Sequence, residues 1–233
     1  MNIFIASISA SLAELTPDES FHCAKVLRYK PGQEINLIDG NGNFYSGMLT
    51  VVNEKKCLVN ITSGPKTQHK HPYYLHLAIA PTKNIDRMEW LVEKAVEIGI
   101  DEITFIRCKN SERTVIKEER LIKIAESAVK QSLQAYIPKL NPLINFSDIF
   151  KTKANLKFIA HCEASDSEEA RKQLKNFDLK NKESLVLIGP EGDFTQEEIT
   201  LAKQNGFSEI SLGDNRLRTE TAGLYVCSAF ALI

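Results

Sequence analysis

Short hydrophobic runs separated by turn signals dominate the first part of the chain. Apolar stretches at 34–39, 44–52 and 56–62 lie between turns that carry Pro31-Gly32 and the glycines of segment 40–42. Strands this short, at this spacing, are typical of a small barrel or sandwich. The pattern therefore predicts a small β-rich domain over residues 1–70, with a short helix at 21–30 ahead of these strands.

The pattern changes after Tyr73, where strand-like runs alternate with helix-like runs. Strands are predicted at 74–80, 102–107, 156–162, 184–189 and 208–213, and helices at 88–98, 119–136, 166–174, 195–206 and 222–233. Alternating strands and helices indicate an α/β domain with a mostly parallel sheet over residues 73–233. Ligands of such a sheet bind beyond the carboxyl ends of its strands. The polar, proline-bounded segment 65–72 is predicted to be a linker.

Three of the predicted strands end in turns suited to binding, at 161–164, 189–193 and 213–218. Their glycines permit positive φ angles and let a ligand approach the backbone closely. Neither GxGxxG nor GxxxxGK[ST] is present, so a nucleotide-like ligand would have to bind by another geometry. Arg218 places a guanidinium at the start of the last apolar helix, where it suits a phosphate or carboxylate or pairs with Glu191 or Glu220. Thr219 is a helix cap or a ligand contact.

The composition indicates a globular protein but does not indicate what it binds. The chain is 43% hydrophobic and 25% charged, which is typical of a globular protein, and 29 basic against 30 acidic residues require any basic surface to be local. The five scattered cysteines form no CxxC pair, and His69, His71 and His76 have no ligand-spaced partner, so neither disulfides nor a metal site are expected. No signal peptide and no apolar run of the ~18 residues that span a bilayer are seen, which predicts a cytoplasmic protein.

Four segments of the chain carry motifs of one known family: GPEGDF (189–194), SLGDNRLRTETAG (211–223), PTKNIDRMEWLVEKAVEIG (81–99) and QSLQAYIPKL (131–140). Together they resemble the RsmE family, SPOUT-class RNA methyltransferases that act on N3 of a uridine in 16S ribosomal RNA. The segment HCAKVLRYKPGQEINLIDGNG (22–42) is similar to that family's PUA-like RNA-binding barrel. The resemblance covers nearly the whole chain in order. It implies a C-terminal SPOUT domain with a trefoil knot, a homodimer, and S-adenosylmethionine held in the knot.

Carried over residue by residue, the resemblance implies three sets of site residues. Arg218 would orient the target uracil or its phosphate and stabilise negative charge, and Glu191 and Glu220 are the candidates for the base that removes the N3 proton. The cofactor would be lined by His161, Cys162, Glu163, Ile188, Gly189, Gly192, Leu212, Gly213, Leu217 and Thr219. RNA phosphates would contact Lys25, Arg28, Lys30, Lys83, Arg107, Lys109 and Arg113.

The chain departs from the family pattern at three places. Asp193 stands where the family often has a second glycine, and Leu133-Gln134 where it usually has Gly-Arg. Asp214-Asn215 replaces a frequent Pro-Arg, with Arg216 one step later. Two alternatives stay open: another SPOUT enzyme, such as a tRNA ribose methyltransferase, and a non-catalytic RNA-binding ribosome assembly factor. The expected partner is 16S ribosomal RNA, free or in the assembled small subunit.

Overall fold

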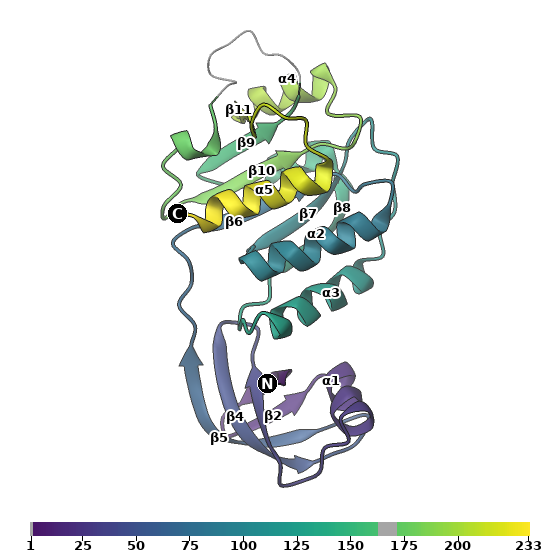
Figure 1. Cartoon of the computed structure of the whole chain (residues 1–233), viewed down its shortest axis with the longest axis vertical. Helices are drawn as coiled ribbons and strands as arrows, with labels where there is room; N and C mark the ends of the chain where they lie inside the picture. The colour runs from purple at the N-terminus through teal and green to yellow at the C-terminus, as the bar shows by residue number, and fades with distance from the viewer. Residues whose placement is uncertain (1, 163–171) are drawn as a thin grey trace. The chain divides into compact units, whose positions relative to one another are not determined.

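The computed structural model describes residues 2–162 and 172–233, so Glu163 and most of the helix predicted at 166–174 lie outside the described residues. The chain forms two compact units (Figure 1). One contains Met1–Lys70 together with Val129–Ile137, and the other contains His71–Ala128 and Pro138–Ile233.

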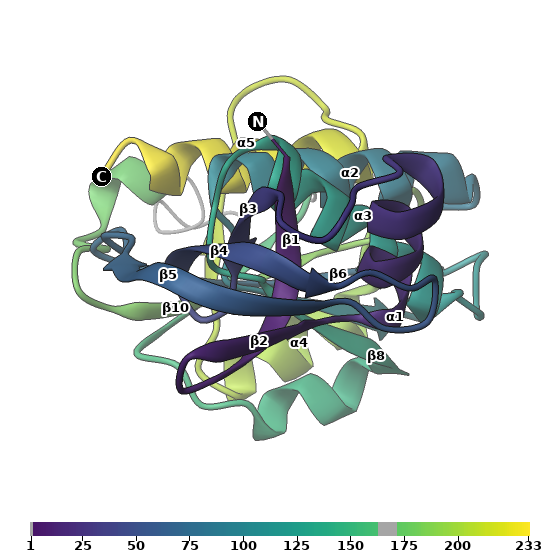
Figure 2. The same ribbon diagram turned by 90° about the horizontal axis from the view of Figure 1, so that it is seen from below.

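The first unit is a closed five-stranded barrel in the order β1-β2-β5-β4-β3 (Figure 2). Its strands are β1 (Ile3–Ser9), β2 (Leu12–Leu15), β3 (Glu34–Ile38), β4 (Asn43–Val51) and β5 (Leu58–Thr67). Phe4, Leu37 and Leu49 are almost completely buried inside it. The predicted small β-rich domain is confirmed. The first two strands were not predicted, and β5 extends into the segment predicted to be a linker.

The helix predicted at 21–30 is wrong in its extent. Instead, α1 (Pro17–Phe21) is followed by one π-helical turn, η1 (His22–Val26). The chain enters α1 with Pro17 at its start, and the Thr16 side chain accepts a hydrogen bond from the Glu19 amide, the usual device that caps a helix. Arg28 has a φ of +55°, so the helical backbone cannot continue to residue 30.

Segment 129–137 packs within the barrel unit, a pairing that the sequence pattern did not predict. The Gly42 amide donates to the Ala135 carbonyl at 2.9 Å, and the Ile137 amide donates to the Gly40 carbonyl at 3.0 Å. A Cβ at Gly42 would lie 2.2 Å from the Tyr136 ring, so only glycine allows this approach. The helix predicted at 119–136 therefore ends earlier: α3 runs over Glu118–Gln131, and Leu133 has a φ of +55°.

The second unit is an α/β domain built on a six-stranded parallel sheet in the order β11-β9-β10-β6-β7-β8. Its strands are β6 (Tyr74–Ile79), β7 (Glu102–Arg107), β8 (Lys139–Asn145), β9 (Leu156–Ala160), β10 (Glu183–Ile188) and β11 (Ser208–Ile210). The predicted α/β fold with a mostly parallel sheet is confirmed. Strand β8 was not predicted because Pro142 interrupts it, which an edge strand tolerates.

Helices cover the sheet on both sides, and two of them share a face. Figure 1 shows α2 (Ile85–Ile98) beside α5 (Thr219–Ala231), with α5 crossing β6 and β10. A Cβ at Gly223 would approach Ile79 to 3.0 Å, so α5 can lie close to the sheet. Helix α4 (Gln196–Gln204) begins with the predicted capping box. In it, the side chains of Thr195 and Glu198 each accept a hydrogen bond from the backbone amide of the other residue. Among the described residues, no helix is long and apolar enough to cross a membrane.

Candidate active site

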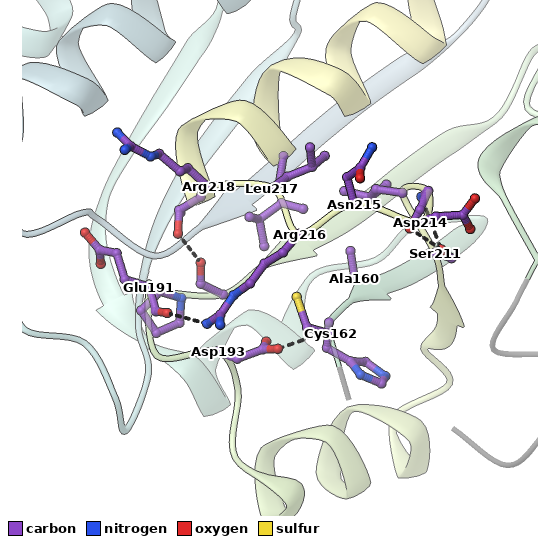
Figure 3. Close-up of a pocket in the computed structure, with 18 residues that line it drawn as sticks. Ala160, Cys162, Glu191, Asp193, Ser211, Asp214, Asn215, Arg216, Leu217 and Arg218 are labelled. Atoms are coloured by element: carbon purple, nitrogen blue, oxygen red, sulfur yellow. Dashed lines mark hydrogen bonds between the residues drawn. The ribbon is translucent and has the colours of Figure 1, made fainter. Parts of the chain in front are cut away.

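A cavity of about 720 Å³ opens where β9, β10 and β11 end (Figure 3). Three loops supply its walls: 160–162 after β9, 188–193 after β10, and 211–219 between β11 and α5. The carboxyl ends of parallel strands are where sheets of this kind bind ligands. Its volume falls in the range of pockets that hold small molecules, about 300–1,000 Å³.

Most of the residues predicted to hold a cofactor meet in this cavity. Those that line it are His161, Cys162, Ile188, Gly189, Leu212, Gly213, Leu217 and Thr219. Gly192 is not among the lining residues, and Glu163 is outside the described part of the chain. Of the predicted catalytic residues, Glu191 and Arg218 line the cavity, whereas Glu220 does not.

Eight further lining residues were not named as site residues in the sequence analysis: Ala160, Pro190, Asp193, Ser211, Asp214, Asn215, Arg216 and Ala222. Three of them are the departures from the family pattern between Gly213 and Leu217. Asp193, the remaining departure in this region, also lines the cavity and has a φ of +61°. Glycine is favoured at such a φ and aspartate is tolerated, which explains how an aspartate occupies this place.

The loops leave backbone groups open to the cavity. Gly213 has a φ of +119°, where a side chain would be strained, and no atom lies within 4 Å of the place a Cβ would occupy. The Thr219 hydroxyl donates to the Gly189 carbonyl at 3.1 Å and joins the start of α5 to the end of β10. Thr219 is 5% exposed, so this bond is shielded from water.

Arg218 is the cation of this cavity that has no protein partner. It occupies the N-cap position of α5, and its exposed side chain makes no hydrogen bond or ion pair with any described residue. The expected alternative, a pair with Glu191 or Glu220, is not what the structure shows. A free guanidinium beside the positive end of a helix favours an anionic ligand.

The two carboxylates predicted as candidate bases have different surroundings. Glu191 is exposed at the cavity, and its Oε1 accepts from the Lys83 amide at 2.9 Å. Glu220 is 7% exposed, and its Oε1 lies 3.7 Å from Nε of Arg87. The Oε2 atom of Glu220 is buried without a partner among the described residues. Glu191 is therefore the carboxylate that a molecule in the cavity can reach.

The basic residues predicted to contact RNA differ in how much of their charge is already paired. Lys83 pairs with Glu112 at 2.8 Å, and this hydrogen bond raises the pKa of Lys83. The Arg113 guanidinium donates to the carbonyls of Thr82 and Lys83, so it fixes that loop. Arg107 donates to the Asn145 side chain at 2.6 Å, Lys25 pairs with Glu54 at 3.2 Å, and Lys109 binds Glu198 through its backbone amide.

The cysteines are free thiols in the structure. Cys162 is exposed at the cavity, where burial and then the charge of Asp193 raise the pKa of its thiol. The described residues contain no group of three or more histidine, cysteine, aspartate and glutamate side chains that could hold a metal ion.

Two family models match the chain. A model described as "RNA methyltransferase domain" matches residues 69–231, and one described as "RNA methyltransferase PUA domain" matches residues 15–62. The ribosomal RNA small subunit methyltransferase E of Mesomycoplasma hyopneumoniae (strain 232) is 32% identical over 190 residues, which cover 78% of this chain and 79% of the relative.

Solved structures agree with these matches. The crystal structure of a probable rRNA-methyltransferase from Porphyromonas gingivalis is 39% identical and superposes with a TM-score of 0.87 over 100% of this chain and 98% of that one. A ribosomal RNA small subunit methyltransferase E from Neisseria gonorrhoeae, solved with S-adenosyl methionine bound, is 27% identical with a TM-score of 0.82, covering 100% and 97%. The barrel, the parallel sheet and the loop-lined cavity are thus those of a known family, and the chain belongs to the RNA methyltransferases typified by ribosomal RNA small subunit methyltransferase E.

Proposed function

We propose that this protein transfers a methyl group from S-adenosylmethionine to N3 of a uridine in 16S ribosomal RNA. The observation that carries the proposal is the unpaired Arg218 guanidinium at the edge of a loop-lined cavity. The relatives named above are ribosomal RNA methyltransferases, and the Neisseria enzyme holds S-adenosyl methionine.

The residues of the cavity suit S-adenosylmethionine. Ile188, Leu212 and Leu217 offer apolar surface to an adenine ring, and Gly189 and Gly213 expose backbone groups to its polar edges. Glu163, predicted to contact the cofactor, would contribute from outside the described residues. When bound, the cofactor supplies a methyl group activated by a positively charged sulfur.

The protein has to make N3 of uracil nucleophilic, because this nitrogen carries a proton at neutral pH. The target base is extruded from the RNA so that its N3 faces the cavity. Glu191 would accept the N3 proton, and the electron pair freed on N3 would take up the methyl group as the methyl–sulfur bond breaks, its electrons staying on the sulfur of S-adenosylhomocysteine. Arg218 orients the uracil or its phosphate and stabilises the negative charge that develops on the ring. Glu220, paired with Arg87, holds the start of α5 and is the second candidate for the base.

The barrel unit and the basic residues bring RNA to this cavity. Arg28 and Lys30, whose side chains make no hydrogen bond or ion pair with a described residue, bind phosphates together with Lys109. Further contacts are Lys25, Lys83, Arg107 and Arg113. The protein acts as a homodimer. The α/β unit is expected to carry the family's trefoil knot.

Mass spectrometry of ribosomal RNA from cells that lack this protein tests the proposal. The expected result is the loss of one N3-methyluridine from 16S ribosomal RNA, restored by the wild-type gene. Loss of a ribose methyl group from tRNA would instead identify another SPOUT enzyme. Unchanged methylation combined with a defect in subunit assembly would identify a non-catalytic assembly factor.

A further inference from the structure

Asp193 connects two of the three loops that form the cavity. Its Oδ2 accepts a hydrogen bond from the Cys162 amide at 2.7 Å, and its Oδ1 accepts one from the Phe194 amide at 2.8 Å (Figure 3 shows the first). The ladder between β9 and β10 ends at Ala160 and Ile188. Beyond that ladder, hydrogen bonds between described residues join 161–162 to 189–194 only through the Asp193 carboxylate.

The turn that carries Asp193 is held from its other side by Asn110. The Asn110 side chain donates to the carbonyls of Gly192 and Asp193, both at 3.1 Å. A Cβ at Gly192 would lie 3.1 Å from the Asn110 Cβ, so the two residues are in close contact. The turn is therefore fixed by one residue outside the cavity, and Asp193 extends this fixed frame to the end of β9.

The third loop is joined to the same turn. The Thr219 hydroxyl donates to the Gly189 carbonyl, and the Arg216 guanidinium reaches the Glu191 carbonyl at 3.5 Å (Figure 3). The loop after β9 is also held toward β11, because His161 Nε2 lies 3.1 Å from Glu209 Oε1. Its connection to the β10 turn is made by Asp193, whereas the loop before α5 has two contacts with that turn. Hydrogen bonds to a charged carboxylate are stronger than neutral ones, and a preformed site avoids the entropy of ordering loops on binding.

We propose that Asp193 is a positioning residue that holds the end of β9 against the β10 turn and so preforms the cavity for S-adenosylmethionine. Both the backbone conformation and the charge of Asp193 are needed for this role. Glycine would adopt the same φ without a carboxylate, and alanine would carry neither the carboxylate nor the tolerance for that φ. The inference rests on the proposed function, because the ligand whose affinity it concerns is the methyl donor.

Calorimetry with S-adenosylmethionine on the full chain tests this role. Asp193→Gly, which keeps the backbone unstrained but removes both hydrogen bonds, is expected to bind about tenfold more weakly. Asp193→Asn retains one acceptor oxygen, so its affinity for S-adenosylmethionine should lie between those of the wild type and Asp193→Gly. Asp178→Asn, which changes an exposed carboxylate that is paired with Lys182 and does not line the cavity, should bind like the wild type.

Kinetics and a double-mutant cycle separate positioning from general stability. The KM of Asp193→Gly for S-adenosylmethionine should rise about tenfold. Its kcat, extrapolated to saturating S-adenosylmethionine, should stay within about twofold of the wild type. Cys162→Pro removes the amide that donates to Asp193, so Asp193→Gly should cost little further affinity in that background. Equal binding by wild type and Asp193→Gly, or the same loss in both backgrounds, would overturn the inference alone. A wild-type protein that gives no heat of binding would overturn the proposed function as well.

Discussion

Two polar clusters lie at opposite ends of the same parallel sheet, and they differ in how completely their groups are paired. At the amino ends of β7 and β8, Glu102 accepts from Lys139 at 2.8 Å, from Asn141 at 2.6 Å and from Tyr74 at 2.8 Å. His76 lies within hydrogen-bond distance of Thr104 at 2.7 Å. At the carboxyl ends, Arg218 has no partner among the described residues.

The difference separates charged groups that stabilise the fold from charged groups that remain available to bind a ligand. A buried polar group without a partner is costly, so groups that only stabilise the fold are saturated by their neighbours, as around Glu102. An exposed guanidinium that the protein leaves unpaired retains its full capacity for an anion. The predictions below test this distinction between the paired and the unpaired cluster.

The largest effect is expected at the unpaired cluster. Arg218→Ala should lower kcat for RNA methylation by a factor of about 10²–10³, the usual loss when a group that stabilises developing charge is removed. The free energy of unfolding and the affinity for S-adenosylmethionine should be close to those of the wild type, because no described contact is lost. Steady-state methyl transfer, calorimetry and urea denaturation measure the three quantities.

Arg120→Ala is the matched control for this variant. Arg120 is also exposed but is paired with Glu89. Its removal should leave kcat within about twofold and should change stability little, because exposed ion pairs contribute little to it. If Arg218→Ala retained normal turnover, the unpaired guanidinium would have no part in the reaction.

The paired cluster should show the opposite behaviour. Glu102→Ala removes the Glu102 carboxylate that accepts from the half-buried Tyr74 hydroxyl, from Lys139 and from the Asn141 amide, and should lower the free energy of unfolding by about 2–3 kcal/mol. At a temperature where the variant stays folded, kcat should be nearly unchanged. Urea denaturation gives the first value and methyl transfer the second. A large fall in kcat without a loss of stability would place Glu102 in the chemistry and break the comparison.

His76 adds a pH dependence to the paired cluster. Burial lowers the pKa of His76 from its ordinary 6.5, against an opposing effect of Glu102 and with a smaller contribution from Lys139. The unfolded chain therefore binds a proton that the folded chain binds less readily. The neutral, buried His76 therefore contributes its full stability to the fold above pH 6.5. This stability is lost as the pH falls through the pKa of His76 in the folded state.

The measurement is urea denaturation between pH 5 and 7.5 for the wild type and His76→Asn. The variant should show a smaller decrease in stability on acidification, whereas His69→Asn, which changes an exposed histidine, should follow the wild type. Identical pH profiles for wild type and His76→Asn would show that this histidine does not contribute to acid sensitivity.

The smallest effect is expected in the barrel unit. There, unpaired basic side chains should contribute more to RNA binding than paired ones. Each phosphate contact contributes about 0.7–0.9 to the slope of log affinity against log salt. Arg28→Gln with Lys30→Gln should therefore flatten the slope by about 1.5. Lys25→Gln should change it less, because Glu54 already pairs with Lys25. Unchanged slopes in all variants would mean that this surface only faces solvent.

Elements with an uninterrupted local pattern could be predicted from the sequence. The predicted strand at 102–107 coincides with β7, and the capping box marks the start of α4 at its observed place. The end of α3 could not be predicted, because Tyr136 packs on Gly42, a residue far away in the chain. Asp193 stood out only as a departure from a pattern. Its contact with Cys162 depends on a left-handed backbone angle and a partner that lies 31 positions earlier.

The account as a whole is tested most directly by nucleoside mass spectrometry after a reaction in vitro. Purified wild-type protein and Arg218→Ala are incubated with S-adenosylmethionine carrying an isotope-labelled methyl group and with small ribosomal subunits that lack the modification. The account predicts one labelled N3-methyluridine in 16S ribosomal RNA with the wild type and almost none with Arg218→Ala. Label on a ribose, label on another base, or equal labelling by both proteins would contradict it.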